Sequence, residues 1–312
     1  MSEGRYARFS ALVGSRLKIR NILTRYALAE CLGTFLLVIF CDGCAAQSVL
    51  TKHAFGNIMT IHIASGIALA MAVYAAGGVT GGHVNPSITL TMCILGRTPW
   101  RHLPVYWLGQ YTGSFLAAVV LYGEYYDALN AYDGGVRAVF GINGTAGLWT
   151  TFPAEFVSVG NGFLDQIVCT ALLLMCVLSI FDPKNMNPSN GLIPIALGAM
   201  FTTLGMSFGV NFGYAVNPAR DLAPRVFVAI AGWGTEVFSF RNYSYFWIPL
   251  LGPHVGAIIG AAIYQLFVGL HFPDSEKKTD ESAINGICKI IQYDIIEFHI
   301  SPFKHVGVTV IQ

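Results

Sequence analysis

The main pattern along the chain is a series of long stretches without a charged side chain. Between Lys52 and Arg97 lie 44 residues with no Asp, Glu, Lys or Arg, and between Lys184 and Arg220 lie another 35. A helix that crosses a bilayer needs about 20 mostly apolar residues. Together with four further stretches, the pattern predicts six membrane-spanning helices, centred on residues 26–48, 58–78, 103–123, 163–181, 191–210 and 247–270.

The 44-residue stretch is too long for one span and too short for two spans with a hydrated loop between them. Its second part is rich in glycine and then becomes helical in pattern up to Gly96. In the other half of the chain, a span that ends near Gly209 is followed by a glycine-containing loop and a second helical start at Pro218. Non-helical backbone at membrane depth is tolerated where it is buried in protein or lines a wet cavity. We therefore expect two re-entrant loops, each opening a half-helix.

The two halves of the chain repeat one design. The tetrapeptides that begin at Val84 and at Val216 lie 132 residues apart, and a Glu30-xxx-Thr34 pattern returns as Gln166-xxx-Thr170, 136 residues later. Three spans per half force the second half to run inverted in the membrane. The sequence thus predicts an all-α membrane protein with six transmembrane helices and two re-entrant half-helices in an inverted 3+3 repeat. Its expected parts are an N-terminal segment 1–21, a membrane domain 22–271 (repeats 22–124 and 160–271) and a tail 272–312.

Composition and charge support a membrane protein and exclude a nucleic-acid-binding one. Apolar residues make up 54% of the chain and charged residues 11%, and the net charge is +1. An average soluble domain carries about 25% charged residues. With six spans both termini lie on one side, and the segments on that side hold 13 of the 18 Lys and Arg residues. Positively charged loops favour the cytoplasm, so we expect both termini there.

Each half-helix opens with an Asn-Pro pair, Asn85-Pro86 and Asn217-Pro218. Proline is favoured in the first turn of a helix, and asparagine before it is a good N-cap whose side-chain oxygen accepts a backbone N–H. Such a cap leaves the amide NH2 free to donate to a passing oxygen. Two inverted half-helices would also bring two positive dipole ends together, which admits neutral molecules and opposes cations and protons. The alternative is an ordinary turn, the interpretation that we favour for Asn187-Pro188.

Arg220 lies one helical turn beyond Asn217 in an apolar region, where an arginine is costly and usually functional. Its five fixed donors suit it to binding a hydroxyl group and repelling cations. The alternative is that its side chain extends to the outer headgroups. Asp221 and Arg225 are spaced i,i+4 and can form an ion pair that orients the loop.

The motifs around these residues resemble one family, the major intrinsic proteins or aquaporins, over roughly residues 22–271. The similar segments are Ala29–Thr34, Gly82–Ser87 and Gly213–Asp221. Three features resemble the glycerol-conducting branch of this family: Asp221 directly after the arginine, Arg225 four residues later, and Pro249-Leu250 in the last span. The long outer loop resembles that of the animal members of this branch. The resemblance implies a homotetramer in the plasma membrane with one pore per protomer. It also implies passive flux of water, glycerol, urea and hydrogen peroxide.

The resemblance assigns pore residues at matching positions. The outer constriction comprises Ser65, Gly205, Tyr214 and Arg220; Gly205 would leave room for a carbon backbone, and Tyr214 would offer an aromatic face to C–H groups. Water-selective members typically carry His at position 205, so its absence favours polyols. Position 65 is usually Phe or Trp in this branch, and Ser65 predicts a wider, more polar filter with weaker discrimination.

The same resemblance assigns the loops that lead to the pore motifs. Pore-lining carbonyls are expected at Gly81, Gly82, His83, Gly213 and Ala215. Ser87 replaces the common Ala after the first Asn-Pro pair, whereas Ala219 keeps it in the second. Glu30 and Gln166, the latter replacing a usual Glu, would hold loop backbone. The His83 ring is interpreted either as a loop anchor or as a pH-sensitive gate. Asn143 in the long outer loop begins a glycosylation sequon.

Other classes of protein stay open at this stage. An ion-coupled secondary transporter would also use inverted repeats and broken helices, with Glu30 as its main candidate buried carboxylate and Asp42 near a span end. A water-only pore is the narrower alternative within the channel class. No nucleophile–base set and no His/Cys cluster points to an enzyme, a metal site or a cofactor.

Overall fold

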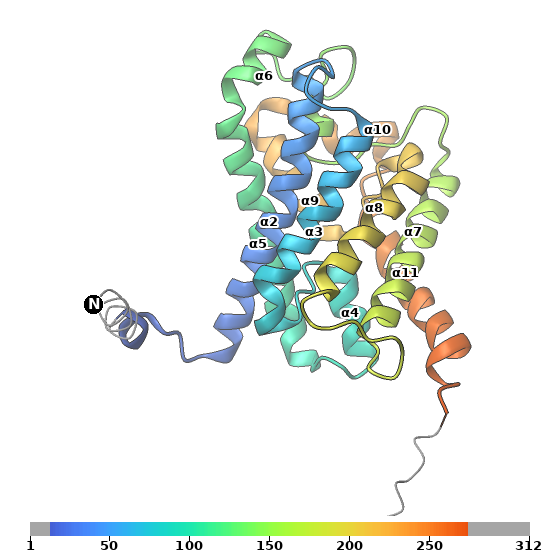
Figure 1. Ribbon diagram of the computed structural model, residues 1–312. Helices are drawn as coiled ribbons and strands as arrows, with labels where there is room; N and C mark the ends of the chain where they lie inside the picture. The colour runs from blue at the N-terminus through green and yellow to red at the C-terminus, as the bar shows by residue number, and fades with distance from the viewer. Residues whose placement is uncertain (1–12, 274–312) are drawn as a thin grey trace, which may run out of the picture. The chain divides into compact units, whose positions relative to one another are not determined.

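The computed structural model describes residues 13–273, so most of the N-terminal segment 1–21 and residues 274–312 of the predicted tail lie outside the described residues. Of the described residues, 13–267 form one compact unit. The helices are α2 (Ile22–Leu50), α3 (Ile58–Thr80), α4 (Pro86–Ile94), η1 (Trp100–His102), α5 (Leu103–Glu124), α6 (Tyr126–Asp133), η2 (Ala146–Leu148), α7 (Val159–Phe181), α8 (Ile193–Phe212), α9 (Pro218–Val228), η3 (Ala229–Trp233), α10 (Glu236–Tyr243), α11 (Ile248–Tyr264) and η4 (Gln265–Gly269) (Figure 1).

The six predicted spans are the long helices α2, α3, α5, α7, α8 and α11. Four of them, and α11 together with η4, are long and apolar enough to cross a membrane, and α5 is the exception among the six. α5 has the necessary length of 22 residues but carries buried polar side chains at Gln110 and Ser114. These polar groups lie inside the protein instead of facing lipid, which is why hydropathy alone undervalues this span.

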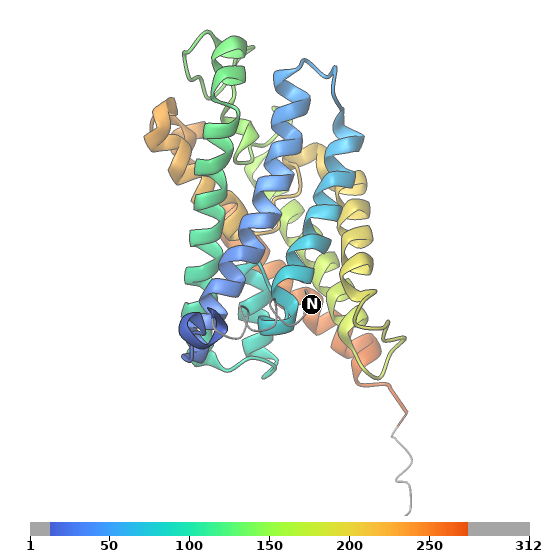
Figure 2. The same ribbon diagram turned by 60° about the vertical axis from the view of Figure 1, so that its left-hand side comes forward.

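The two halves of the chain pack in the same way. In the first half α2 lies beside both α3 and α5, and in the second half α7 lies beside both α8 and α11 (Figures 1 and 2). Small residues allow the closest contacts: a Cβ at Gly113 of α5 would lie 2.1 Å from the carbonyl oxygen of Cys31, and one at Gly260 of α11 would lie 2.2 Å from that of Ala171. Close backbone approach at small residues is the usual way in which membrane helices associate.

The half-helices α4 and α9 complete each half and join it to the other. α4 packs on α11 and α5, and α9 packs on α5 and α11, so each half-helix contacts the last long helix of both repeats. Figure 1 places α4 in the lower part of the bundle and α9 above it. The short elements α6 and α10 lie at the same end of the bundle as the last turn of α2, which we call the α6 end.

Candidate pore

The two half-helices begin face to face, and the Asn-Pro pairs lie at their junction. The side-chain oxygen of Asn85 accepts from the backbone N–H of Ser87 at 2.9 Å, and that of Asn217 accepts from Ala219 at 3.1 Å and from Arg220 at 3.3 Å. Both asparagines therefore act as the predicted N-caps.

The amide nitrogens of the caps tie the two halves together. Nδ2 of Asn85 donates to the carbonyl oxygen of Val216 at 2.9 Å, and Nδ2 of Asn217 donates to that of Val84 at 2.8 Å. The amide NH2 groups are thus not entirely free, as the sequence suggested: one hydrogen of each is used between the loops. The second hydrogen of each amide remains for a solute, because both asparagines line the cavity.

Backbone strain accompanies this junction. Val84 and Val216 both adopt positive φ angles, 45° and 39°. This region is unusual for a β-branched residue and costs of order 1–3 kcal/mol each. The surrounding hydrogen bonds hold the strained backbone, since Val84 and Val216 donate their N–H groups to Glu30 and Gln166 respectively.

Glu30 and Gln166 hold the loops in different ways. Both carboxylate oxygens of the fully buried Glu30 are occupied, by the N–H of His83 at 3.0 Å, the N–H of Val84 at 2.7 Å and the side chain of Gln110 at 2.7 Å. Gln166 differs from Glu30 because its amide also carries an NH2 group, which needs an acceptor. Its Nε2 donates to Oδ2 of Asp165 at 3.3 Å.

Asp165 was not among the residues selected from sequence. Its other oxygen accepts from Nδ2 of Asn211 at 2.8 Å, so this carboxylate lies between two amides. The amide group of Gln166, at the position where the resemblance leads us to expect Glu, therefore has an acceptor next to it in the chain.

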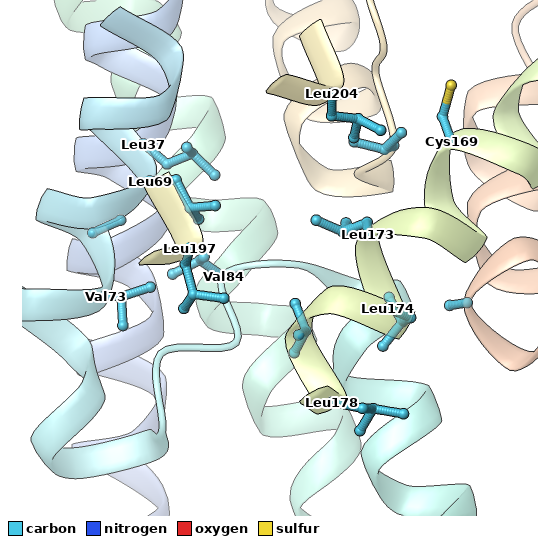
Figure 3. Close-up of a cluster of buried hydrophobic side chains, with 14 of the residues drawn as sticks. Leu37, Leu69, Val73, Val84, Cys169, Leu173, Leu174, Leu178, Leu197 and Leu204 are labelled. Carbon is cyan, nitrogen blue, oxygen red and sulfur yellow. The ribbon is translucent and has the colours of Figure 1, made fainter. Parts of the chain in front are cut away.

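A single cavity of about 560 Å³ runs past both asparagines. Its lining extends from Arg97 and Phe181 to Gly147 and Phe152 at the α6 end, and it includes the five loop residues whose carbonyls were expected at the pore: Gly81, Gly82, His83, Gly213 and Ala215. Most of the remaining lining is apolar. Figure 3 shows the buried cluster that supplies it, with Leu37, Leu69 and Val73 from α2 and α3, Leu173 from α7, Leu197 from α8 and Val84 from the first loop.

The predicted filter residues gather between Asn217 and the α6 end. Ser65, Tyr214 and Arg220 all line the cavity. The Ser65 hydroxyl donates to the carbonyl oxygen of Ile61 at 2.8 Å within its own helix. Gly205, by contrast, is not a lining residue: a Cβ there would lie 2.6 Å from Cζ of Tyr214 and 2.8 Å from Nδ1 of His62. The room beside Gly205, expected for a solute, is filled by these two rings.

His62 is a lining residue that sequence reasoning missed. Its Nδ1 lies 3.2 Å from the hydroxyl oxygen of Tyr214, and the two ring centroids are 5.2 Å apart. His62 is three residues before Ser65 and so shares its helix face, which is the signal that would have found it. The predicted filter thus has an imidazole one turn from Ser65.

Arg220 does not extend to the headgroups. Its Nη1 donates to the carbonyl oxygen of Trp149 at 2.9 Å, and its Nη2 forms an ion pair with Asp42 at 2.7 Å. The next two charged residues form the predicted i,i+4 pair, with Nη2 of Arg225 2.8 Å from Oδ1 of Asp221 and both side chains fully buried.

The Asp221–Arg225 pair also fixes the long loop before α7. The second oxygen of Asp221 accepts from the backbone N–H and the hydroxyl of Thr151, and Arg225 donates to the carbonyl oxygens of Thr151 and Val237. These bonds attach α9 to the loop before α7 and to α10 at the α6 end.

The other predicted residues lie as follows. The His83 ring places Nδ1 3.1 Å from the hydroxyl of Thr89 and packs on Tyr106, as expected of a loop anchor. Ser87 is buried, and its hydroxyl has no partner among the described residues. Asn143 is exposed in the loop between α6 and η2. Glu30 does not line the cavity and its oxygens are occupied, so it does not favour the ion-coupled transporter.

A bundle of membrane helices that encloses a cavity, with two half-helix N-termini and their capping amides at its centre, is a channel for water and small neutral solutes. Comparison with known proteins gives the family. The model described as "Major intrinsic protein" matches residues 18–264. The chain belongs to this family, that of the aquaporins.

Relatives and one solved structure agree with this assignment. Aquaporin-2 of Milnesium tardigradum is 46% identical over 268 residues (86% of this chain, 83% of the relative). Aquaporin-9 of Homo sapiens is 46% identical over 269 residues (86% and 91%), and human Aquaporin-10 is 43% identical over 271 (87% and 90%). The crystal structure of the aquaglyceroporin from Plasmodium falciparum matches with a TM-score of 0.71 and 25% identity, covering 79% of this chain and 97% of that one.

Proposed function

We propose that this chain is an aquaglyceroporin: a passive pore for water, glycerol and urea, and for hydrogen peroxide, that excludes ions and catalyses no reaction. The observation that carries the proposal is the cavity that passes both capping asparagines and the Ser65, Tyr214 and Arg220 side chains. Polar groups along a mostly apolar lining suit a molecule that carries hydroxyls on a carbon backbone. The likeness to an aquaglyceroporin structure supports glycerol over a water-only pore.

The filter composition supports a broad solute range. Ser65 carries the small side chain that predicts a wide constriction, while His62 and Tyr214 add two hydrogen-bonding groups to its lining. A polar filter of this kind compensates the desolvation of hydroxyl and amide groups, because each hydrogen bond lost to water is replaced.

The arrangement in the cell is part of the same proposal. Channel domain 22–271 lies in the plasma membrane as a homotetramer with one pore per protomer, both termini are cytoplasmic, and Asn143 is glycosylated. Two of the five basic residues counted on the outer side, Arg220 and Arg225, form ion pairs inside the protein, which strengthens the charge asymmetry between the sides. The exposure of Asn143 supports the modification.

The test is stopped-flow light scattering on proteoliposomes under water, glycerol and urea gradients. We expect rapid, non-saturating glycerol flux with a low activation energy. Ser65→Phe introduces the ring that the branch usually carries, and it should slow urea more than glycerol. Thr203→Val on the exposed side of α8 is the matched control, because the Thr203 hydroxyl bonds only its own helix and lies outside the cavity lining.

Each outcome separates the hypotheses. Water flux without glycerol flux would overturn the glycerol assignment and leave a water pore. Saturable uptake that follows an ion gradient would favour a transporter instead. Equal slowing of all solutes by Ser65→Phe would contradict the wide-filter argument alone.

A further inference from the structure

One acidic residue outside the set of filter residues contacts the filter arginine directly. Asp42 lies in α2, close to its α6 end, and its side chain is fully buried. Its Oδ1 accepts from Nη2 of Arg220 at 2.7 Å. Arg220 lines the cavity and Asp42 does not, so the carboxylate lies behind the guanidinium as seen from the lumen.

The guanidinium is held at two points. Nη2 is bound to Asp42 on α2, and Nη1 is bound to the carbonyl oxygen of Trp149, whose own buried indole donates to the carbonyl oxygen of Ala118. The backbone of Arg220 is held as well, because its N–H is capped by Asn217. Planar guanidinium groups use such a fork to fix their orientation.

The two arginines of α9 and the two aspartates next to them form two separate ion pairs. Arg220 is paired with Asp42, and the neighbouring Arg225 is paired with Asp221. The second oxygen of Asp42 has no hydrogen-bond partner among the described residues, so the carboxylate depends on the ion pair for its compensation. A fully buried carboxylate and a largely buried guanidinium, of whose side chain 18% is exposed, are strongly coupled when they form a direct ion pair.

From this geometry we infer that Asp42 is a positioning residue of the pore, which holds the Arg220 guanidinium against α2 and thereby sets the free width of the outer constriction. It touches no solute and acts through Arg220. The inference rests on the proposed function, since it concerns which solutes pass the filter.

Removal of Asp42 leaves the largely buried Arg220 guanidinium without its counter-charge, which is unfavourable. The cavity that Arg220 already lines is the space next to the guanidinium that can hold water. The guanidinium therefore moves into the lumen, where it can be hydrated, and narrows the constriction. Glycerol fills more of the bore than water does, so its flux falls further.

The experiment measures glycerol and water permeabilities of the full chain in proteoliposomes. In Asp42→Ala we expect the ratio of glycerol to water permeability to fall about fivefold or more, because both the charge and the acceptor are lost. In Asp42→Asn an amide oxygen can still accept from Nη2, so the ratio should recover towards the wild type. Thr34→Val is the control: Thr34 is equally buried in α2, about 12 Å away along the helix, and its hydroxyl has no partner among the described residues.

An unchanged or increased ratio in Asp42→Ala would overturn the inference. So would an equal decrease in Thr34→Val, which would indicate a general loss of packing in α2. The amount of folded protein is measured by size-exclusion chromatography before reconstitution. If Asp42→Ala does not fold, the glycerol-to-water ratio of Asp42→Asn decides. We expect that ratio to lie between the wild-type value and about half of the wild-type value. Failure of the wild type to conduct glycerol would instead contradict the proposed function. In that case water permeability tests the inference, and an equal water permeability in Asp42→Ala and the wild type would reject it.

Discussion

Gly205 is the position where a single methyl group should change the pore most. A Cβ there would lie 2.6 Å from Cζ of Tyr214 and 2.8 Å from Nδ1 of His62. Ordinary contact begins at 3.4 Å, so in Gly205→Ala the Tyr214 ring has to move by the difference between 3.4 and 2.6 Å, about 0.8 Å. Both rings line the cavity, and the displacement therefore changes the bore.

The expected magnitude follows from the cost of overpacking. Tyr214 is packed against the rings of His62 and Phe201, with centroids 5.2 and 5.3 Å away, so it has little room to relax. An extra methyl in a well-packed site costs about 1–3 kcal/mol. If this cost is added to the barrier for glycerol, the flux falls by about fivefold to 150-fold, at 1.36 kcal/mol for each factor of ten. Water is smaller and should be slowed less.

The assay is stopped-flow light scattering, with the glycerol-to-water ratio as the readout. Gly78→Ala is the matched control, because it also replaces a glycine in a membrane helix and a Cβ there meets no heavy atom within 4 Å. A wild-type ratio in Gly205→Ala would refute the argument, since it would mean that the rings beside Gly205 do not set the bore. A reduced ratio in Gly78→Ala would assign the effect to glycine replacement in general.

Two further predictions concern the supports of the pore loops. Gln166→Glu places a carboxylate beside Oδ2 of Asp165, now 3.3 Å from the Gln166 amide, and should destabilise the protein by about 1–3 kcal/mol, seen as a lower melting temperature in detergent. The double variant with Asp165→Asn should recover the loss, and no recovery would contradict the pairing. Arg225→Lys loses the fork that reaches Asp221 and Val237 together; it should lower stability by about 1.5–3 kcal/mol, and an unchanged melting temperature would show that the fork is dispensable.

The helices, the two half-helices and their caps could be predicted from the sequence because they depend on local spacing. The N-cap bond of Asn85 spans two residues, and the ion pair between Asp221 and Arg225 spans four. The repeat of the Asn-Pro pairs, each within a long charge-free stretch, is enough to predict both loops at membrane depth. The family resemblance then assigned Ser65, Tyr214 and Arg220 to one constriction, and the structure places all three along the same cavity.

Other features depend on tertiary contacts that no spacing rule reaches. Asp42 and Arg220 are 178 residues apart, and His62 and Tyr214 are 152 apart, yet each pair is in contact. The space beside Gly205, expected to be open, is filled by rings that arrive from another helix and from a loop.

The sequence by itself determined where the chain crosses the membrane and where its helices begin, since hydrophobic length and capping act over a few residues. Only the tertiary structure decided that Asp42 pairs with Arg220 and that the His62 and Tyr214 rings occupy the space beside Gly205. Those contacts depend on how the two inverted halves pack on each other, because this packing brings side chains distant in sequence into direct contact.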